Sequence, residues 1–440
     1  MKIAFVNQPE IIRIPPQTSI LIWIHQVARG LMNRGHEVVV FGRRENNETA
    51  KEIIYEGVRY LTIGGSHNRE LKIFYKLFNS KSHDLPFHSS QLFELDYVFS
   101  VGFNLKKFNP DIIHTHNYSQ FAPVLNWVNP MSKLILHMHC EWLHQINRKA
   151  ILRRLKYIDM VLGCSDYIIN RFSERFPHFS LVRSIPNGVD VNQFFPNDDG
   201  QIVNRDMIRI LFVGRVSPEK GVHVVLRAFE KAACLHPGLE LEVVGKQLSC
   251  SYGFIVGMTD DDITRSLERF YPEPKTSRNA LEFYGKYLKE STPNNLSDSV
   301  HFIDWVPHEE LAEHYQNADI VVLPSSGMEA FGMPVVEAMA AGVPVVVASS
   351  GGMPEIIEDG KTGFVVPREN PDALADAILR LVKDKQLRIS MGHAGRRRVL
   401  ELYSWEKVVD QLEASYEQVC ADQSRTKIQV NSVKGLSVPK

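Results

Sequence analysis

Two glutamates flank a glycine turn in the stretch GMEAFGMPVVEAMAAGVPVV at 327–346. Glu329 and Glu337 lie eight positions apart (337 − 329). Pro334 suits the first turn of a helix, because its missing N–H would have no partner there. Three residues precede this proline in the turn: Phe331, Gly332 and Met333. Their backbone amides are therefore expected at a helix N-terminus, which is a ready site for an anion.

Carboxylates repel phosphate, so two glutamates beside an anion site suggest a ligand that also carries hydroxyl groups. A carboxylate can accept two hydrogen bonds from a vicinal diol such as a ribose or a hexose. Phosphate and diols together indicate a sugar nucleotide. The alternative is that Glu329 and Glu337 only stabilise the start of a helix through its macrodipole.

Two cations lie in a second loop, within FVGRVSPEKGVHVVLRAF at 212–229. Arg215 and Lys220 are five positions apart (220 − 215), between an apolar run and a helical stretch. Such cations could bind a diphosphate and stabilise the charge that develops on it as it leaves. The stretch has neither the Gly-Lys-Ser/Thr of a Walker A loop nor a Gly-x-Gly-x-x-Gly fingerprint. The alternative is a solvated loop with surface charges.

Two His-x-His pairs, at 114/116 and 137/139, lie where two predicted strands end. Strand alternation places each pair on one face of its strand. A metallohydrolase could use such a cluster to hold zinc and activate water. Nearby carboxylates are few, so core or cleft histidines are favoured, and we predict no metal.

Two further segments have both a functional and a structural interpretation. Residues 260–262 form an Asp-Asp-Asp run similar to an Asp-x-Asp metal site, but the helical stretch that follows favours a helix cap. RELKIFYKLF at 69–78 is basic and amphipathic. It could rest on an anionic membrane, although a helix packed against its own domain is favoured.

Apolar strand runs alternate with helical stretches along the chain, which is typical of α/β proteins with parallel sheets covered on both faces. The runs of the first half are 2–7, 36–42, 111–117, 133–139 and 159–165. Those of the second half are 209–215, 239–245, 300–306, 319–325 and 343–349. A Pro/Asn/Gly/Asp-rich stretch at 185–200 separates the halves and is predicted to be a linker.

This pattern predicts two doubly wound, Rossmann-like domains that face a central cleft. The first spans 1–195 and the second 206–403, with an insertion at about 247–299. A helix at 404–420 is expected to cross back to the first domain, and 421–440 is expected to be a disordered tail.

The composition of the chain argues against a nucleic-acid-binding, a disulfide-rich or a membrane-spanning protein. The chain has 440 residues, 44% of them hydrophobic, and a net charge of −1, so no broad basic surface is available for nucleic acid. Its five cysteines have no CxxC spacing, which favours a reducing compartment. No apolar run is long enough for a signal peptide or a spanning helix. We therefore expect a cytoplasmic protein, with peripheral membrane contact through 69–78 as an open possibility.

Residues 185–405 resemble the retaining glycosyltransferases of the GT-B fold, in the large family known as glycosyl transferases group 1. This family includes phosphatidylinositol mannosyltransferases and sucrose-phosphate synthases. The stretches that carry the resemblance are FVGRVSPEKG, IPNGVD, YSWEKVV and the long run from LPSSGMEAFG to KTGFVVP. The amino-terminal half matches only in outline, through GLMNRGHEVVV, DIIHTHN and the region of His139.

The resemblance implies a role for each matching residue. Arg215 and Lys220 would bind the donor diphosphate, together with the backbone amides of the 331–333 turn. Glu337 would hold the ribose hydroxyls. Glu329 and His139 would be the catalytic residues, which orient the transferred sugar. The resemblance also implies retention of anomeric configuration, with no cofactor and no metal.

Three features depart from the family pattern. Gln17, Thr18 and Ser19 stand where a Gly-Gly pair is usual, so Thr18 and Ser19, with His116, are candidates for the acceptor side. Asp304 replaces a common glycine beside the expected base pocket, for which Val306 is the candidate. The 247–299 insertion has no counterpart in the family pattern.

The sequence thus predicts a metal-independent, retaining hexosyltransferase. It would move a sugar from a nucleotide-diphosphate sugar, with UDP the usual choice in the family, to a hydroxyl acceptor in glycan, glycolipid or metabolite synthesis. Two alternatives stay open: a sugar-nucleotide 2-epimerase on the same scaffold, and a non-catalytic sugar-nucleotide binder. The acceptor and the oligomeric state are not fixed by the sequence.

Overall fold

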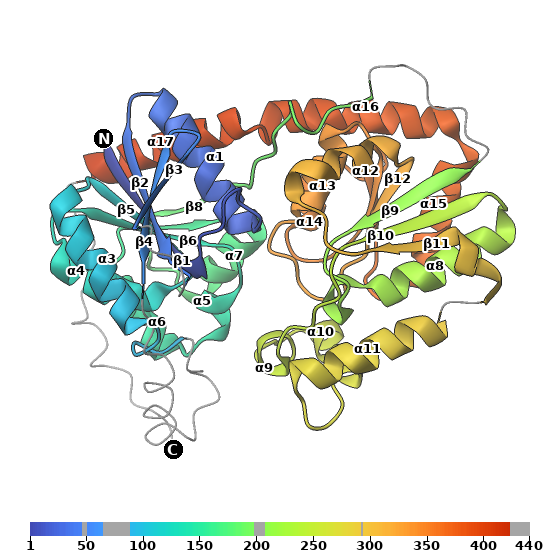
Figure 1. Ribbon diagram of the computed structural model, residues 1–440, viewed down its shortest axis with the longest axis horizontal. Helices are drawn as coiled ribbons and strands as arrows, with labels where there is room; N and C mark the ends of the chain where they lie inside the picture. Colours follow the sequence, from blue (N-terminus) through green and yellow to red (C-terminus); the bar gives the residue numbers. More distant parts are fainter. Residues whose placement is uncertain (46–50, 65–88, 198–206, 292–293, 423–440) are drawn as a thin grey trace. The chain divides into compact units, whose positions relative to one another are not determined.

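The computed structural model describes residues 1–45, 51–64, 89–197, 207–291 and 294–422. Contacts divide the chain into two compact units (Figure 1). Unit 1 comprises Met1–Ile185 and Val409–Lys440, and unit 2 comprises Pro186–Val408. The predicted helix at 69–78 and nearly all of the predicted tail lie outside the described residues.

Unit 1 is built on an eight-stranded sheet with the strand order β3-β4-β2-β1-β5-β6-β7-β8. Every neighbouring pair is parallel except the antiparallel pair β3–β4. The strands are β1 (Lys2–Ile11), β2 (Glu37–Arg43), β3 (Glu52–Tyr55), β4 (Val58–Ile63), β5 (Ile112–His116), β6 (Lys133–Met138), β7 (Met160–Gly163) and β8 (Val182–Ser184).

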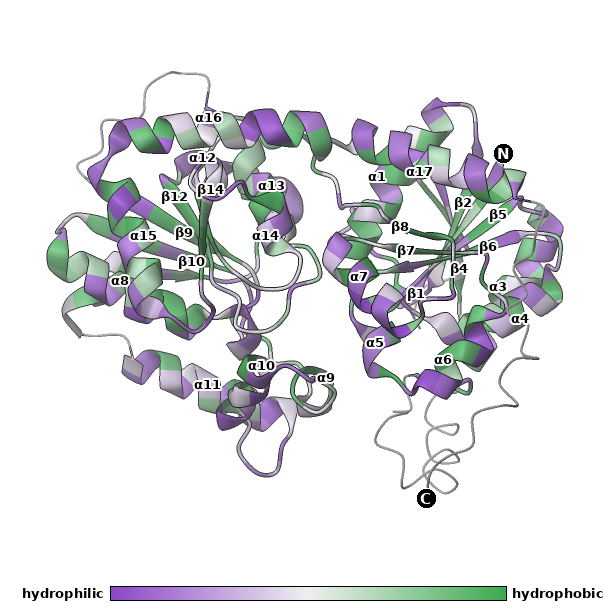
Figure 2. Cartoon of the chain, turned by 180° about the vertical axis from the view of Figure 1, so that it is seen from behind, coloured by the Kyte–Doolittle hydropathy of each residue, from purple (hydrophilic) through white to green (hydrophobic). Residues whose placement is uncertain are grey.

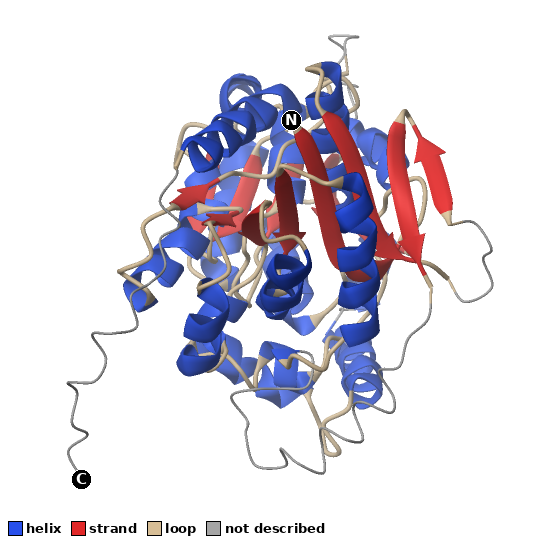
Figure 3. Ribbon diagram, turned by 90° about the vertical axis from the view of Figure 1, so that its left-hand side faces the viewer, coloured by secondary structure: helices blue, strands red, loops and turns tan. Residues whose placement is uncertain are grey.

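Helices flank this sheet on both sides (Figures 1 and 3). They are α1 (Ser19–Asn33), α3 (Leu95–Phe108), η2 (Ser119–Phe121), α4 (Ala122–Val128), α5 (Trp142–Gln145), α6 (Arg148–Leu155), α7 (Asp166–Arg175) and α17 (Trp405–Ala421). The strand interiors are apolar because both faces are covered, and β5 is buried over its whole length. Figure 2 shows this as hydrophobic colour concentrated on the strands.

Unit 2 is built on a parallel sheet with the order β11-β10-β9-β12-β13-β14. The strands are β9 (Ile208–Val213), β10 (Leu239–Val244), β11 (Val300–Ile303), β12 (Ile320–Leu323), β13 (Val345–Ala348) and β14 (Gly363–Val366). The helices are η3 (Pro218–Lys220), α8 (Val222–Leu235), α9 (Tyr252–Ile255), α10 (Asp262–Ser266), η4 (Leu267–Phe270), α11 (Ser277–Ser291), η5 (Asn294–Ser299), η6 (His308–Glu310), α12 (Leu311–Asn317), α13 (Met333–Ala340), α14 (Met353–Ile356), α15 (Pro371–Lys383) and α16 (Lys385–Leu402).

The segment at 247–299 forms the short elements α9, α10, η4, α11 and η5. Apolar side chains of α11, including Tyr284 and Leu288, join the core of unit 2. Asp261 caps α10 by accepting a hydrogen bond of 2.7 Å from the backbone N–H of Thr264. The predicted capping role within the Asp-Asp-Asp run is therefore confirmed.

The α/β class, the parallel sheets and all ten predicted strands are confirmed. The antiparallel hairpin β3–β4 and the edge strands β8 and β14 were not predicted. The last helix, α17, begins at Trp405, and the part from Val409 onward belongs to unit 1. Within the described residues, the helices all lack the combination of length and apolar character that crossing a bilayer requires.

Candidate functional site

The loop after β9 and the loop after β12 are joined by their backbones at the carboxyl ends of these neighbouring strands. The N–H of Gly327 donates to the carbonyl of Glu219 over 2.9 Å. Gly221, with φ +76°, lies so close to the carbonyl of Pro324 that an added Cβ would come within 2.0 Å of that oxygen. The two sequence motifs therefore form one site in unit 2, where open parallel sheets usually bind ligands.

Lys220 and Glu329 meet in this site as an ion pair. The hydroxyl of Ser325 also donates to Glu329 Oε1 over 3.0 Å. Burial alone would raise the pKa of Glu329, but the charge and hydrogen bond of Lys220 lower it below its usual value. Glu329 is thus an ionised hydrogen-bond acceptor held beside a cation.

The backbone of Glu329 is fixed as firmly as its side chain. Its N–H donates to Ser350 Oγ over 3.0 Å, and its carbonyl accepts from the N–H of Gly352 over 2.8 Å. Gly351, with φ +52°, leaves room for that carbonyl, since a Cβ there would lie 1.9 Å from the oxygen. The loop after β13 therefore positions the glutamate.

Arg215 lies at the same strand ends and has two partners. Its guanidinium is 3.1 Å from Glu219 Oε1 and donates to Cys250 Sγ over 2.8 Å. The side chain is still 41% exposed, so it can reach a ligand. Burial lowers the pKa of Arg215 while Glu219 raises it, and the net shift is upward. The arginine therefore remains charged.

The predicted helix N-terminus is present at the start of α13. Gly332 has φ +114° and is the N-cap residue, and Pro334 occupies the first turn. Within the described residues, the structure records no acceptor for the backbone N–H groups of Phe331, Gly332 and Met333. The helix ends at Ala340, and Gly342 follows with φ +74°, as the sequence predicts.

Glu337, the predicted ribose ligand, is 2% exposed and lies on α13. Its two carboxylate oxygens accept hydrogen bonds from His308 Nε2 over 2.9 Å and from the hydroxyl of Tyr315 over 2.8 Å. Burial lowers the pKa of His308, but the hydrogen bond and charge of Glu337 outweigh it and raise the pKa. A ribose would therefore share this carboxylate with His308 and Tyr315.

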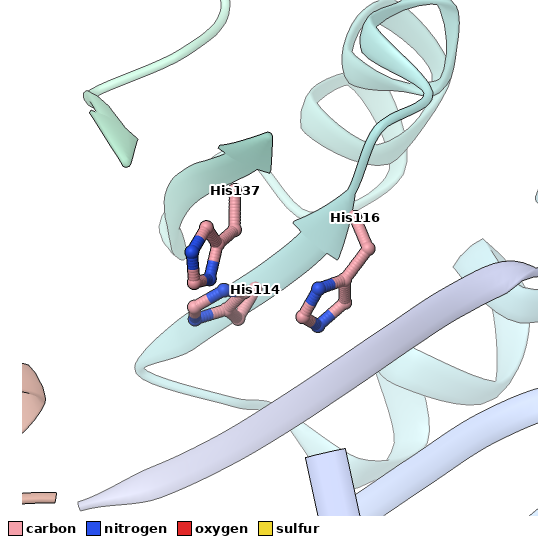
Figure 4. Close-up of side chains that lie close together, drawn as sticks. All are labelled: His114, His116 and His137. Carbon is pink, nitrogen blue, oxygen red and sulfur yellow. The ribbon is translucent and has the colours of Figure 1, made fainter. Parts of the chain in front are cut away.

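In unit 1, three histidines lie on one face of β5 and β6, as strand alternation predicts, and a fourth follows β6 directly. His116 pairs with His137 in the parallel register. The rings of His114, His116 and His137 are buried and lie on the same side of the two strands (Figure 4). His139 follows β6, is partly exposed, and its Nε2 is 3.0 Å from His116 Nδ1.

These histidines are also the residues of the described chain that could hold a metal ion. The three candidate nitrogens of His114, His116 and His137 spread over 4.8 Å, whereas two nitrogens on one zinc ion lie at most about 4.2 Å apart. The group contains no carboxylate to offset a divalent charge. Binding would require the rings to move within a packed core.

The remaining candidates lie on other loops. Thr18 is the N-cap residue of α1 and donates to Glu10 Oε2 over 3.2 Å, and Ser19 is exposed at the start of the helix. Val306 is half-buried between β11 and η6, and Asp304 beside it is exposed.

Sequence reasoning missed the polar residues that hold the predicted ones in place. They are Glu219, Cys250, His308, Tyr315, Ser325 and Ser350. Cys250, His308, Tyr315 and Ser350 reach their partners from other loops or helices, so spacing gives no signal for them. Glu219 and Ser325 lie four positions from their partners in the same loops, but the spacing alone does not show that the side chains meet. A buried carboxylate needs hydrogen-bond donors, so the site glutamates indicate that such partners exist, but not which residues supply them.

Two family models match the chain in succession. Glycosyltransferase Family 4 matches residues 22–193, and Glycosyl transferases group 1 matches residues 197–398. A relative of similar length is the lipopolysaccharide 1,2-N-acetylglucosaminetransferase of Salmonella typhimurium. It is 26% identical over 424 residues, which cover 94% of this chain and 97% of the relative.

Solved structures share the fold. The sucrose-phosphate synthase of Thermosynechococcus elongatus has a TM-score of 0.69 at 22% identity, over 95% of this chain and 98% of that one. Anabaena HepE, solved in complex with UDP and glucose, has a TM-score of 0.67 at 18% identity, over 95% and 99% of the two chains. The two models, the two parallel-sheet units and these likenesses agree: the chain is a GT-B glycosyltransferase, and its second half matches the glycosyl transferases group 1.

Proposed function

We propose that this glycosyltransferase transfers a hexosyl group from a UDP-sugar to a hydroxyl acceptor, with retention of anomeric configuration and without a divalent metal. The observation that carries the proposal is the Lys220–Glu329 pair beside the start of α13. This arrangement brings a cation, a carboxylate and backbone amides that have no acceptor among the described residues into one site.

The donor diphosphate would lie between these groups. Arg215 and Lys220 supply two positive charges, and the N–H groups at 331–333 supply fixed dipoles at a helix N-terminus. Side-chain cations of this kind can stabilise the negative charge that builds up on a departing diphosphate. That is the task for which other transferases use a bound divalent ion.

The sugar would be held by carboxylates on either side of the diphosphate. Glu329 accepts hydrogen bonds from hydroxyls of the transferred sugar, and Glu337 accepts from the ribose. Retention follows if the acceptor oxygen bonds to the anomeric carbon on the face from which UDP leaves. The bond from the anomeric carbon to the phosphate oxygen breaks, and the acceptor's proton passes to that oxygen.

The choice of UDP is supported by relatives. HepE of Anabaena binds UDP in its solved complex, and the Salmonella relative is named as an N-acetylglucosaminetransferase. We expect Val306 to lie beside the base, Thr18 and Ser19 to lie on the acceptor side, and the partly exposed His139 to face the transferred sugar. His116 was also a candidate for the acceptor side, but its ring is fully buried, so we do not expect it to contact the acceptor.

Thermal denaturation with UDP, GDP and ADP tests the donor site. A nucleotide at 100 times its dissociation constant should stabilise the protein by about 2.7 kcal/mol, and UDP should do so at the lowest concentration. Stabilisation by none of the three would contradict the donor site. Proton NMR of the sugar released by slow donor hydrolysis tests retention, since the first anomer formed should match the donor. Conversion of the donor to its 2-epimer would instead identify an epimerase.

A sugar-transfer assay in excess EDTA tests whether the reaction is independent of a divalent metal. We expect turnover to be unchanged after exhaustive dialysis against EDTA, because side chains supply the positive charge. A loss of turnover that added Mg²⁺ or Mn²⁺ restores would overturn this part of the proposal.

A further inference from the structure

We propose that His116 is a positioning residue for His139: the Nδ1–H of His116 donates to Nε2 of His139, so that neutral His139 keeps its own proton on Nδ1. His139 would then offer an N–H donor to the substrate and could not act as a base. This inference rests on the proposed function, in which His139 faces the transferred sugar.

Two neighbours hold His139, one through its ring and one through its main chain. His116 Nδ1 lies 3.0 Å from His139 Nε2, and the two rings stack with centroids 5.2 Å apart. The backbone N–H of His139 donates to Asn117 Oδ1 over 2.7 Å, which holds the main chain at the strand end. The hydrogen bond that one ring nitrogen makes decides which nitrogen of a neutral histidine carries the proton.

The surroundings of His116 select the direction of this hydrogen bond. The ring is fully buried, and its Nε2 has no hydrogen-bond partner. If His116 accepted a hydrogen bond from His139, the proton of His116 would lie on Nε2 as a buried N–H without an acceptor. Buried N–H groups without an acceptor are rarer in folded proteins than buried acceptors without a donor. If His116 donates, only a lone pair is left unpaired. Donation by His116 is therefore the favoured arrangement.

Both rings are neutral. Burial lowers the pKa of His116 well below its usual value and lowers the pKa of His139 to about 3. With Nε2 occupied as an acceptor, the proton of His139 lies on Nδ1, for which the described residues provide no acceptor. His139 is also the only partly exposed ring of the four described. It therefore suits an oxygen acceptor on the ligand, such as a sugar hydroxyl oxygen.

NMR reads the tautomer directly. Long-range ¹H–¹⁵N correlation spectra of the full chain, labelled with ¹⁵N-histidine, distinguish a protonated from a bare ring nitrogen. The signals of His139 are assigned by their loss in a His139→Gln variant. We expect a protonated Nδ1 and a bare Nε2 in the wild type, and a mixture of tautomers in His116→Leu. A protonated Nε2 in the wild type would overturn the inference.

Kinetics provide a second test with a matched control. His116→Leu should lower kcat by about 10-fold to 100-fold with little change in UDP affinity, by analogy with the hydrogen-bond partners of metal-bound histidines, whose loss has effects of this size. His116→Asn, whose amide N–H can replace Nδ1–H, should recover most of the loss.

The control is His114→Leu, which removes an equally buried ring that is hydrogen-bonded to Tyr416 instead of His139. Equal losses in the His114 and His116 variants would show a general packing effect and contradict the inference. If the wild type transfers no sugar at all, the proposed function fails, whereas the NMR spectrum still decides the tautomer.

Discussion

The ammonium group of Lys220 is ion-paired with the carboxylate of Glu329, although the residues are 109 positions apart in the chain. This pair links the two motifs that the sequence shows separately. A bound diphosphate would compete with Glu329 for Lys220, and the hydroxyls of the donor sugar would replace Lys220 as partners of Glu329. Donor binding is therefore expected to exchange one internal ion pair for two contacts with the ligand.

Removal of the cation should weaken both donor binding and transfer. Lys220→Ala is expected to lower kcat by about 10²-fold to 10³-fold, the usual effect of losing one electrostatic stabiliser, and to raise the Kd for UDP. Calorimetric titration with UDP and a transfer assay measure the two effects. Lys231→Ala is the matched control, because Lys231 pairs with Asp372 at the surface of α8. Unchanged UDP affinity in Lys220→Ala would contradict the donor site.

Removal of the carboxylate charge should separate binding of UDP from transfer of the sugar. In Glu329→Gln, Lys220 loses its internal partner and becomes available to the diphosphate. UDP is therefore expected to bind at least as tightly as in the wild type, while kcat for the UDP-sugar falls by about 10²-fold or more. Titration with UDP alone and with the UDP-sugar measures the difference. A parallel loss of UDP affinity would mean that Glu329 only supports the loop.

His308 should make the stability of unit 2 depend on pH. Its folded pKa is raised above 6.5 by Glu337. The stabilisation that the protonated pair provides is fully present below pH 6.5 and is lost as pH rises through the folded pKa. Denaturant unfolding from about pH 6 to about pH 9 should show this decline in the wild type and a smaller one in His308→Gln. Identical pH profiles would contradict a protonated His308 in the folded protein.

The cap of α10 should stabilise the loop that carries the donor site. Asp261 accepts from Thr264 and is ion-paired with Arg368 over 2.6 Å, and Arg368 in turn donates to the carbonyl of Ser326. Asp261→Ala is expected to cost about 1–3 kcal/mol, since it removes a cap and leaves a buried guanidinium with one partner fewer. Chemical denaturation measures the loss. The neighbouring Asp262→Ala, which removes an exposed pair with Arg265, should change stability by less than about 0.5 kcal/mol.

Most of the sheet architecture could be read from the sequence, because strands buried on both faces appear as continuous apolar runs. The predicted boundaries of β9 and β12 differ from the observed ones by no more than two residues at either end. The turn at 331–333 was also predicted correctly as the start of a helix, since proline and glycine restrict the backbone in specific ways. Both the strands and this turn depend mainly on the conformational preferences of neighbouring residues in the sequence.

The partners of the site residues could not be predicted, because they depend on which loops meet in three dimensions. Glu337 is held by His308 on η6 and Tyr315 on α12, which are 29 and 22 positions away. Nothing in the local sequence indicates that these side chains converge. The hairpin β3–β4 was missed for another reason. β3 has only four residues and is at most half-buried, and β4 is interrupted by the exposed Arg59, so neither strand has a continuous apolar run.

Gly351 limits which substitutions this protein can accept in the loop that positions Glu329. A side chain at this position would collide with the main-chain oxygen of Glu329. In a library with every amino acid at one position, selected for turnover, position 351 should therefore yield glycine alone, whereas position 361, occupied by the exposed Lys361, should tolerate many replacements. Variants with a new sugar preference would have to arise at other positions, because any residue at 329 carries the same main-chain oxygen.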